Sequence, residues 1–159
     1  RRVFAQVCRL AVRLNKALVV HVRDAGQDAV DILRENIPTD WPIHLHGYTG
    51  EVEEVEELLA TFSRLYVGFC GVLTFHDFIS CCSRCAPLYK PGCRFCGGEY
   101  DNVRRDLDGL ARAVPFDRIL LETDAPYMSP VPLCARACQP WMASLTAQAV
   151  ARRKGVQVE

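Results

Sequence analysis

The stretch ILLETDAPYMSP, residues 119–130, begins as an aliphatic strand and ends in two carboxylates, Glu122 and Asp124, followed by Pro126. Burying an unpaired carboxylate costs several kcal/mol, roughly the magnitude at which the group becomes neutral instead. The two acids therefore require cationic partners at the end of this strand.

Three further β-rich runs precede this strand, and helical patterns lie between them. They are ALVVHV (17–22), WPIHLHG (41–47) and LYVGF (65–69), and the fourth strand covers RILLET (118–123). Apolar strands that alternate with helices predict a parallel sheet covered by helices. No G-x-G-x-x-G or G-x-x-x-x-G-K turn follows any of these strands, which disfavours dinucleotide and P-loop sites.

Helical periodicity predicts a helix before the first strand, one at 51–62, one at 101–114 and one at about 140–153. The helix at 51–62 begins with acidic residues, which suit the positive end of a helix dipole. Pro115 ends the helix at 101–114. The apolar stripes consist of Val3, Val7, Leu10 and Leu14 in the first helix, Val52, Val55, Leu59 and Phe62 in the second, and Val103, Leu107, Leu110 and Val114 in the third.

The spacing of the strands indicates an insertion. The strands begin at residues 17, 41 and 65, but the fourth begins only at 118, and the excess roughly equals the Gly-, Pro- and Cys-rich stretch at about 75–100. A regular βα repeat with short connections fits a (β/α)₈ barrel or a doubly wound sheet. Barrels carry catalytic residues at the carboxyl ends of their strands. Here those ends carry His21, His46 and Asp124.

Imidazoles and carboxylates share one face near the carboxyl ends of three strands, because residues two apart on a strand point the same way. Neutral imidazole together with carboxylate is the ligand set of a hydrolytic divalent metal site. A single His in an apolar strand is more often a core residue, but three strand ends with the same feature favour a shared site. The aligned residues are Val19, His21 and Arg23, then His44, His46 and Tyr48, then Leu120, Glu122 and Asp124.

Position along each strand suggests which side chain binds the metal. His46 adjoins the loop that begins at Gly47, so we expect it to be the ligand. His44 would lie one layer deeper, as a support for a ligand or as a core residue. By the same reasoning Asp124 is the expected ligand, and Glu122 would support one.

Composition limits how this protein contacts nucleic acid or lipid. The 159 residues contain 19 Lys and Arg and 19 Asp and Glu, so the formal net charge is zero and any phosphate binding must be local. Arg23 could bind a phosphate oxygen through its guanidinium fork; a salt bridge to Asp24 or Glu122 is an equal alternative. No run of about 18 apolar residues is present, so we expect no membrane partner. The sequence specifies no oligomeric state.

Five of the nine cysteines fall within residues 81–96. An odd number with this distribution does not indicate a secreted disulfide scaffold, so we expect an intracellular location, in the nucleus or cytoplasm. CSRCAPLYKPGCRFC contains two C-x₂-C pairs, which are typical of a tetrahedral structural zinc site. An irregular loop, or sequence outside the folded protein, is the alternative interpretation. The candidate zinc ligands are Cys82, Cys85, Cys93 and Cys96.

The strand-end motifs, in their order along the chain, resemble the TatD family of metal-dependent deoxyribonucleases. They are VVHVRDA (19–25), HGYTG (46–50) and LLETDAPY (120–127), and AVPFDRILLETDAPYMSP is the most specific match. The resemblance covers nearly the whole chain except about 76–100. HLHGYTG and the tail around CQPWMASLTAQAVARRKG are similar to an animal branch of this family.

The resemblance implies a TIM barrel of the metallo-dependent hydrolase type, of which residues 1–159 form the C-terminal half with an insertion at about 75–100. It implies two divalent ions (Mg, Mn or Zn), one held by His21 and His46. Asp124 would hold the other and orient or deprotonate the attacking water. The implied substrate is DNA or RNA, at ends or in single strands.

This chain also departs from the family pattern. The family's N-terminal H-x-H pair and bridging Glu are absent from it, so we expect residues 1–159 alone to be inactive. VPLCARACQPW stands where the family usually has an Asn-rich stretch, which affects substrate contacts there. The alternatives are another metallo-hydrolase on the same barrel, such as a small-molecule amidohydrolase or phosphoesterase, or an inactive fragment with a zinc-binding insertion.

Overall fold

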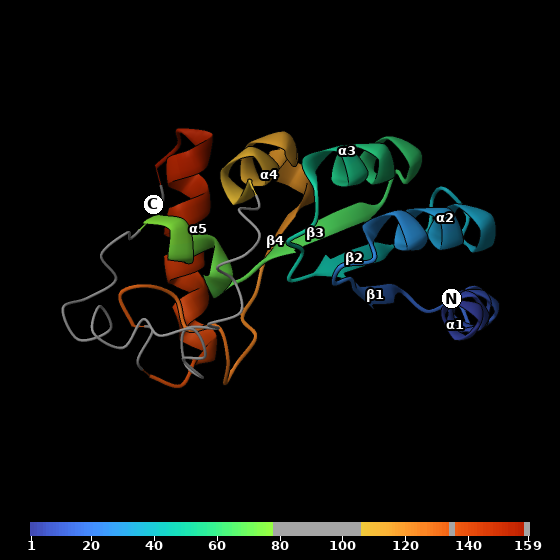
Figure 1. Cartoon of the computed structure of the whole chain (residues 1–159), viewed down its shortest axis with the longest axis horizontal. Helices are drawn as coiled ribbons and strands as arrows, with labels where there is room; N and C mark the ends of the chain where they lie inside the picture. Colours follow the sequence, from blue (N-terminus) through green and yellow to red (C-terminus); the bar gives the residue numbers. More distant parts are fainter. Residues whose placement is uncertain (78–105, 134–135, 158–159) are drawn as a thin grey trace. The chain divides into compact units, whose positions relative to one another are not determined.

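Strands and helices alternate along the chain in the computed structural model, which describes residues 1–77, 106–133 and 136–157 (Figure 1). The strands are β1 (Leu18–His21), β2 (Ile43–His46), β3 (Leu65–Phe69) and β4 (Ile119–Leu121). The α-helices are α1 (Arg2–Arg13), α2 (Gly26–Asn36), α3 (Val52–Thr61), α4 (Leu107–Ala113) and α5 (Ala143–Lys154). Short 3₁₀ helices cover η1 (Gly71–Asp77), η3 (Phe116–Arg118) and η4 (Pro140–Met142).

The four strands form one sheet in the order β1-β2-β3-β4. β1 pairs with β2 and β2 with β3, both in parallel, and the first register runs from Leu18 opposite Ile43 to His21 opposite His46. Each predicted strand agrees with the observed one to within two residues at either end. The predicted parallel α/β sheet is therefore confirmed.

The chain divides into two compact units. Arg1–Gly68 and Arg112–Leu120 form the first, which contains most of the sheet, and Phe69–Ala111 and Leu121–Glu159 form the second, which contains α5. The candidate zinc ligands Cys82, Cys85, Cys93 and Cys96 lie outside the described residues. The predicted zinc site therefore stays a prediction.

The core of the first unit lies between the sheet and helices α2 and α3, which lie on the same side of the strands (Figure 1). Alternation along the strands directs one set of side chains to this core and leaves the other set on the opposite face. Val19, on that opposite face, is 65% exposed. Each buried Leu or Val contributes roughly 1.5–3 kcal/mol. The core side chains include Leu18, Val20, Ile43, Leu45, Leu65, Val67, Val30, Leu33, Val55 and Leu58.

Helix α1 forms where periodicity predicted it, but its apolar stripe does not face the core of the described residues. Val3, Val7, Leu10 and Leu14 are all exposed, by 41% to 68%. The buried positions are instead Cys8 and Ala11, on the side on which α1 contacts α2. Their small side chains suit close packing of two helices. In α3 the buried set is also shifted, to Val55 and Leu58, and Phe62 directly after the helix is buried as well.

In the second unit, α5 packs on η1, and a buried arginine ties the two together. Arg153 Nη2 donates to the carbonyl oxygen of Leu73 at 3.0 Å, and the guanidinium also pairs with the Asp108 carboxylate. Gly155, with φ of +68°, ends α5 in the left-handed conformation that favours glycine. No helix in the described part of the chain is long and apolar enough to span a bilayer.

Gly71 begins η1 at a point where two backbone segments of the second unit approach closely. A Cβ on Gly71 would overlap the carbonyl oxygen of Met128 and approach the nitrogen of Pro130. Only a residue without a side chain fits this contact. Beside it, the buried Thr74 hydroxyl accepts a hydrogen bond from the amide of Val131 at 2.8 Å.

Candidate metal-binding site

Three histidine rings of the first unit gather at the carboxyl ends of β1 and β2. The parallel register sets His21 opposite His46, and their ring centroids are 6.2 Å apart. The ring of His44 lies 6.0 Å from that of His46, at an interplanar angle of 89°. Ring nitrogens of His44 and His46 lie within 4.8 Å of one another. We call these three residues the histidine cluster.

The histidine cluster lies on the sheet face opposite the core, since Val20 and Leu45, its neighbours on the strands, are buried. His44 and His46 are half-buried, whereas His21 is exposed. The prediction assigned His46 as ligand and His44 as a support. The ring nitrogens of His44 and His46 are so close that His44 is a candidate ligand as well. Imidazole nitrogens at this separation fit a divalent ion such as Zn²⁺ or Mn²⁺.

The loop after His46 is fixed by its backbone and by burial. Gly47 has φ of +53°, a left-handed conformation that turns the chain directly after the histidine. Tyr48 and Thr49 are only 2% and 8% exposed, and the Tyr48 amide donates to the carbonyl oxygen of Gly68 at 3.2 Å. The loop therefore holds β2 and its terminal histidine against β3.

Arg23, the candidate phosphate contact, follows β1 on the exposed side of the strand. Its Nε lies 3.8 Å from the carboxylate of Asp24, and both side chains are more than half exposed. Such an exposed pair contributes about 0–1 kcal/mol to stability. Asp24 itself has φ of +53°, so the chain turns sharply between β1 and α2.

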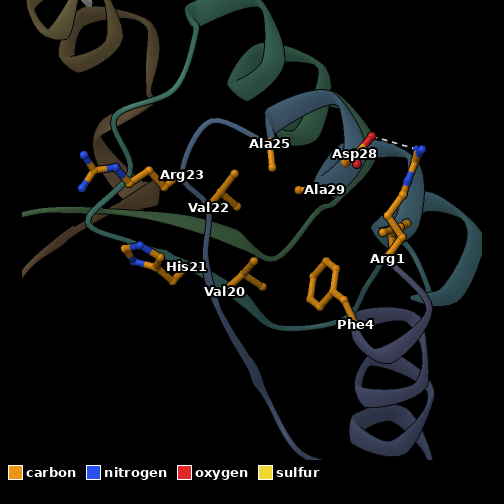
Figure 2. A pocket seen from close by; sticks show the side chains of 10 residues that line it. Arg1, Phe4, Val20, His21, Val22, Arg23, Ala25, Asp28 and Ala29 are labelled. Carbon is orange, nitrogen blue, oxygen red and sulfur yellow. Dashed lines mark ion pairs between the residues drawn. The ribbon is translucent and has the colours of Figure 1, made fainter.

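A pocket of about 340 Å³ adjoins β1 in the first unit. Figure 2 shows His21 and Arg23 on one side of the strand and Val20 and Val22 on the other. An ion pair of 2.8 Å between Arg1 and Asp28 lies at one end of the pocket. The remaining lining is largely apolar: Phe4, Ala25, Ala29 and Ile32.

Two carboxylates of the second unit follow β4, as the sequence predicted from ILLETDAPY. Glu122 donates its amide to the carbonyl oxygen of Phe69 at 3.0 Å, which continues the pairing of β4 with the end of β3. Asp124 begins a tight turn that the amide of Tyr127 closes at 2.7 Å. Both acidic side chains are half-buried.

Cys70 is a neighbour of these acids that the sequence analysis did not single out. It directly follows β3 and is 4% exposed. Burial above all raises the pKa of its thiol to about 11, and the charges of Glu122 and Asp124 raise it further, against a lowering backbone hydrogen bond at Val72. The thiol is therefore neutral near pH 7. The strand-end rule, applied to the residue after LYVGF, would have found it.

Comparison with known proteins relates this site to a family. The family model described as TatD related DNase matches residues 1–86 and 96–159. The human 3'-5' RNA nuclease TATDN2 is 33% identical over 156 residues, which are 96% of this chain and 17% of that protein. The uncharacterized metal-dependent hydrolase YcfH of Escherichia coli K12 is 34% identical over 98% of this chain and 48% of its own length.

Solved structures show the same fold. The TatD homologue YJJV of Escherichia coli matches with a TM-score of 0.66 at 17% identity, over 92% of this chain and 45% of that one. An uncharacterized amidohydrolase of Saccharomyces cerevisiae matches with a TM-score of 0.64 at 16% identity, over 96% and 52%. This chain thus spans about half the length of YcfH and of both solved structures. The predicted partial (β/α)₈ barrel is confirmed.

Proposed function

This chain belongs to the TatD-related family of metal-dependent hydrolases, and we propose that its protein hydrolyses phosphodiester bonds of DNA or RNA. The observation that carries the proposal is the histidine cluster, in which parallel register brings His21 and His46 together at the ends of adjacent strands. Three imidazoles on an otherwise apolar sheet are hard to explain as core packing. They supply the nitrogen ligands that a hydrolytic ion needs.

Each candidate residue has a proposed role in metal binding or proton transfer. His21 and His46, whose ring centroids are 6.2 Å apart, would hold one ion through ring nitrogens. A ring nitrogen of His44 lies within 4.8 Å of one of His46. Asp124 would hold a second ion and accept a proton from the attacking water. Glu122 would support a ligand. When bound, divalent ions supply Lewis-acid polarisation of the phosphoryl group and a more acidic water.

Substrate contacts would be local. The 159 residues carry no formal net charge, which favours local phosphate contacts over a broad basic surface that coats a duplex. Arg23, whose side chain is exposed at the end of β1 beside the carboxylate of Asp24, would bind one phosphate oxygen. We therefore expect action on ends or single strands. A human relative is named as an RNA nuclease, so RNA is tested beside DNA.

The test is cleavage of end-labelled single-stranded DNA and RNA oligonucleotides by the whole protein, with Mg²⁺, Mn²⁺ or EDTA. Ion-dependent cleavage that His46→Ala abolishes would support the proposal. A small-molecule phosphodiester or amide as the sole substrate, with both oligonucleotides intact, would contradict it and favour another metallo-hydrolase. Omitting the ion during the reaction serves as the reversible control, because adding Mn²⁺ back should restore cleavage.

We further propose that the protein works inside the cell, in the nucleus or cytoplasm. Cys8, Cys70 and Cys138 are buried free thiols in the described part of the chain. Reduced buried cysteines are typical of proteins in a reducing compartment. Fluorescent tagging of the whole protein, at either end, would test the location.

A further inference from the structure

The carboxylate of Glu54 is held by more contacts than a helix cap requires. Glu54 is the third residue of α3 and forms a capping box with Glu51, whose amide it accepts at 3.3 Å. Its Oε2 also accepts a hydrogen bond from the Tyr48 hydroxyl at 2.9 Å. Tyr48 belongs to the loop that follows His46 and is 2% exposed. The hydrogen bonds that cap α3 therefore include Tyr48, a residue of the loop that follows the proposed metal ligand His46.

The same carboxylate lies against the start of α2. A Cβ added to Gly26, the first residue of α2, would overlap the Glu54 carboxylate, and one added to Gly50 would crowd its Oε2. A negative group at this place is also attracted by the positive end of the α2 dipole. Since α2 follows β1 after the short turn at Asp24, Glu54 contacts the segment beyond His21.

Glu54 therefore touches the chain just after both strands that carry the histidine cluster. On one side it holds the loop of His46 through Tyr48, and on the other it packs on Gly26. We propose that Glu54 is a positioning residue that sets the spacing between the rings of His21 and His46. The proposal rests on the proposed function in one respect, namely that this cluster binds a metal ion.

The experiment measures ring position and metal affinity separately in the whole protein. Proton NMR of the metal-free chain detects Overhauser contacts between the rings of His21 and His46, and calorimetry gives the Mn²⁺ affinity. Glu54→Ala should lose the ring contacts and bind Mn²⁺ about 10-fold or more weakly, the range for groups that orient a ligand. Glu54→Gln should largely restore both, because its amide oxygen can still accept from Tyr48.

Two further variants remove the contact while Glu54 itself remains. Tyr48→Phe deletes the hydroxyl alone, and Gly26→Ala places a methyl group where the carboxylate lies. Alanine favours a helix over glycine, so a purely local effect of Gly26→Ala would be stabilising. We expect it instead to displace Glu54 and to weaken Mn²⁺ binding as Glu54→Ala does. Glu53→Ala is the matched control, since Glu53 is an exposed acid of the same helical turn.

Each outcome decides the proposal. If Glu54→Ala lowers the melting temperature but keeps the ring contacts and the affinity, the residue is only a helix cap and the proposal is wrong. If Glu54→Ala fails to fold, Tyr48→Phe and Gly26→Ala decide, and wild-type values for both would overturn it. If the wild-type chain shows the ring contacts but binds no Mn²⁺, the proposed function loses its metal site, and the ring contacts alone decide the role of Glu54.

Discussion

Asp124 stands in a tight turn after β4, half-buried, with its backbone carbonyl fixed by the amide of Tyr127. Changing Asp124→Asn in the whole protein should lower hydrolysis by about 10²–10⁴-fold, because the amide keeps the shape but loses the charge and the basic oxygen. Steady-state cleavage of a labelled oligonucleotide measures the effect. Asp117→Asn is the control, since the Asp117 side chain is 82% exposed. Near-normal turnover with unchanged metal content would refute the role of Asp124.

The two histidines of β2 should differ in their effect on metal binding. We expect His46→Ala to lower Mn²⁺ affinity by more than ~100-fold, and His44→Ala by no more than about 10–100-fold, the range for groups that orient a ligand. Calorimetric titration of both variants gives the ranking. The reverse order would mean that His44, whose ring nitrogen lies within 4.8 Å of that of His46, is the ligand.

Cys70 should make stability fall at high pH. Its pKa is raised from 9.0 to about 11 in the folded chain, so the folded state holds the proton more tightly than the unfolded state. This contribution is present below pH 9 and is lost as the pH rises from about 9 to 11, and it amounts to roughly 2–3 kcal/mol at most. Urea unfolding of wild type and Cys70→Ala at pH 8 and pH 11 measures it. The difference in unfolding free energy between the two proteins should shrink at the higher pH; a pH-independent difference would contradict the account.

At the scale of elements, α1 and α2 offer a matched pair of leucines. Leu33 of α2 is fully buried, whereas Leu10 of α1 is 41% exposed. Leu33→Ala should lower the free energy of unfolding by about 2–5 kcal/mol through lost burial and a cavity. Leu10→Ala should change it by about 0.5 kcal/mol or less. Equal losses in urea denaturation would show that the stripe of α1 is packed in solution.

The strands were predictable because a buried parallel strand is a short run of consecutive, mostly apolar residues, as in ALVVHV. The helices were less so. Periodicity located α1 but could not say which side contacts α2, because Cys8 and Ala11 pack by being small rather than strongly apolar. The sequence analysis did not place α2, which begins with Gly26 and has mixed polarity.

The candidate site, too, was only partly predictable from the sequence. Strand ends and side-chain alternation selected His21, His46, Glu122 and Asp124 as candidates from the sequence, and their role as metal ligands stays a prediction. The part played by Glu54 could not be predicted, since its contacts with Tyr48 and Gly26 arise only when β1, α2, β2 and α3 have packed. Cys70 was overlooked because a lone cysteine after a strand has no distinctive pattern.

At the scale of the whole molecule, residues 1–159 alone should show no nuclease turnover above background. The chain spans about half the length of the bacterial relative YcfH, and the N-terminal H-x-H pair and bridging Glu that the family resemblance implies are absent from it. A metal site that lacks part of its ligand set binds its ions weakly. The measurement is Mn²⁺-dependent cleavage by purified residues 1–159 beside the same chain with Asp124→Asn. Cleavage by the first and not by the second would show that this part suffices.

The parallel pairing of His21 with His46 also has a kinetic consequence. In an antiparallel hairpin, two such residues could meet across a short turn, but here all of α2 must cross over before the strands can align. Pairings of this kind form slowly, because the chain loses loop entropy before it gains contacts. A refolding chain should therefore acquire helical signal first and affinity for a metal ion later, so that capture of the ion reports completion of the sheet.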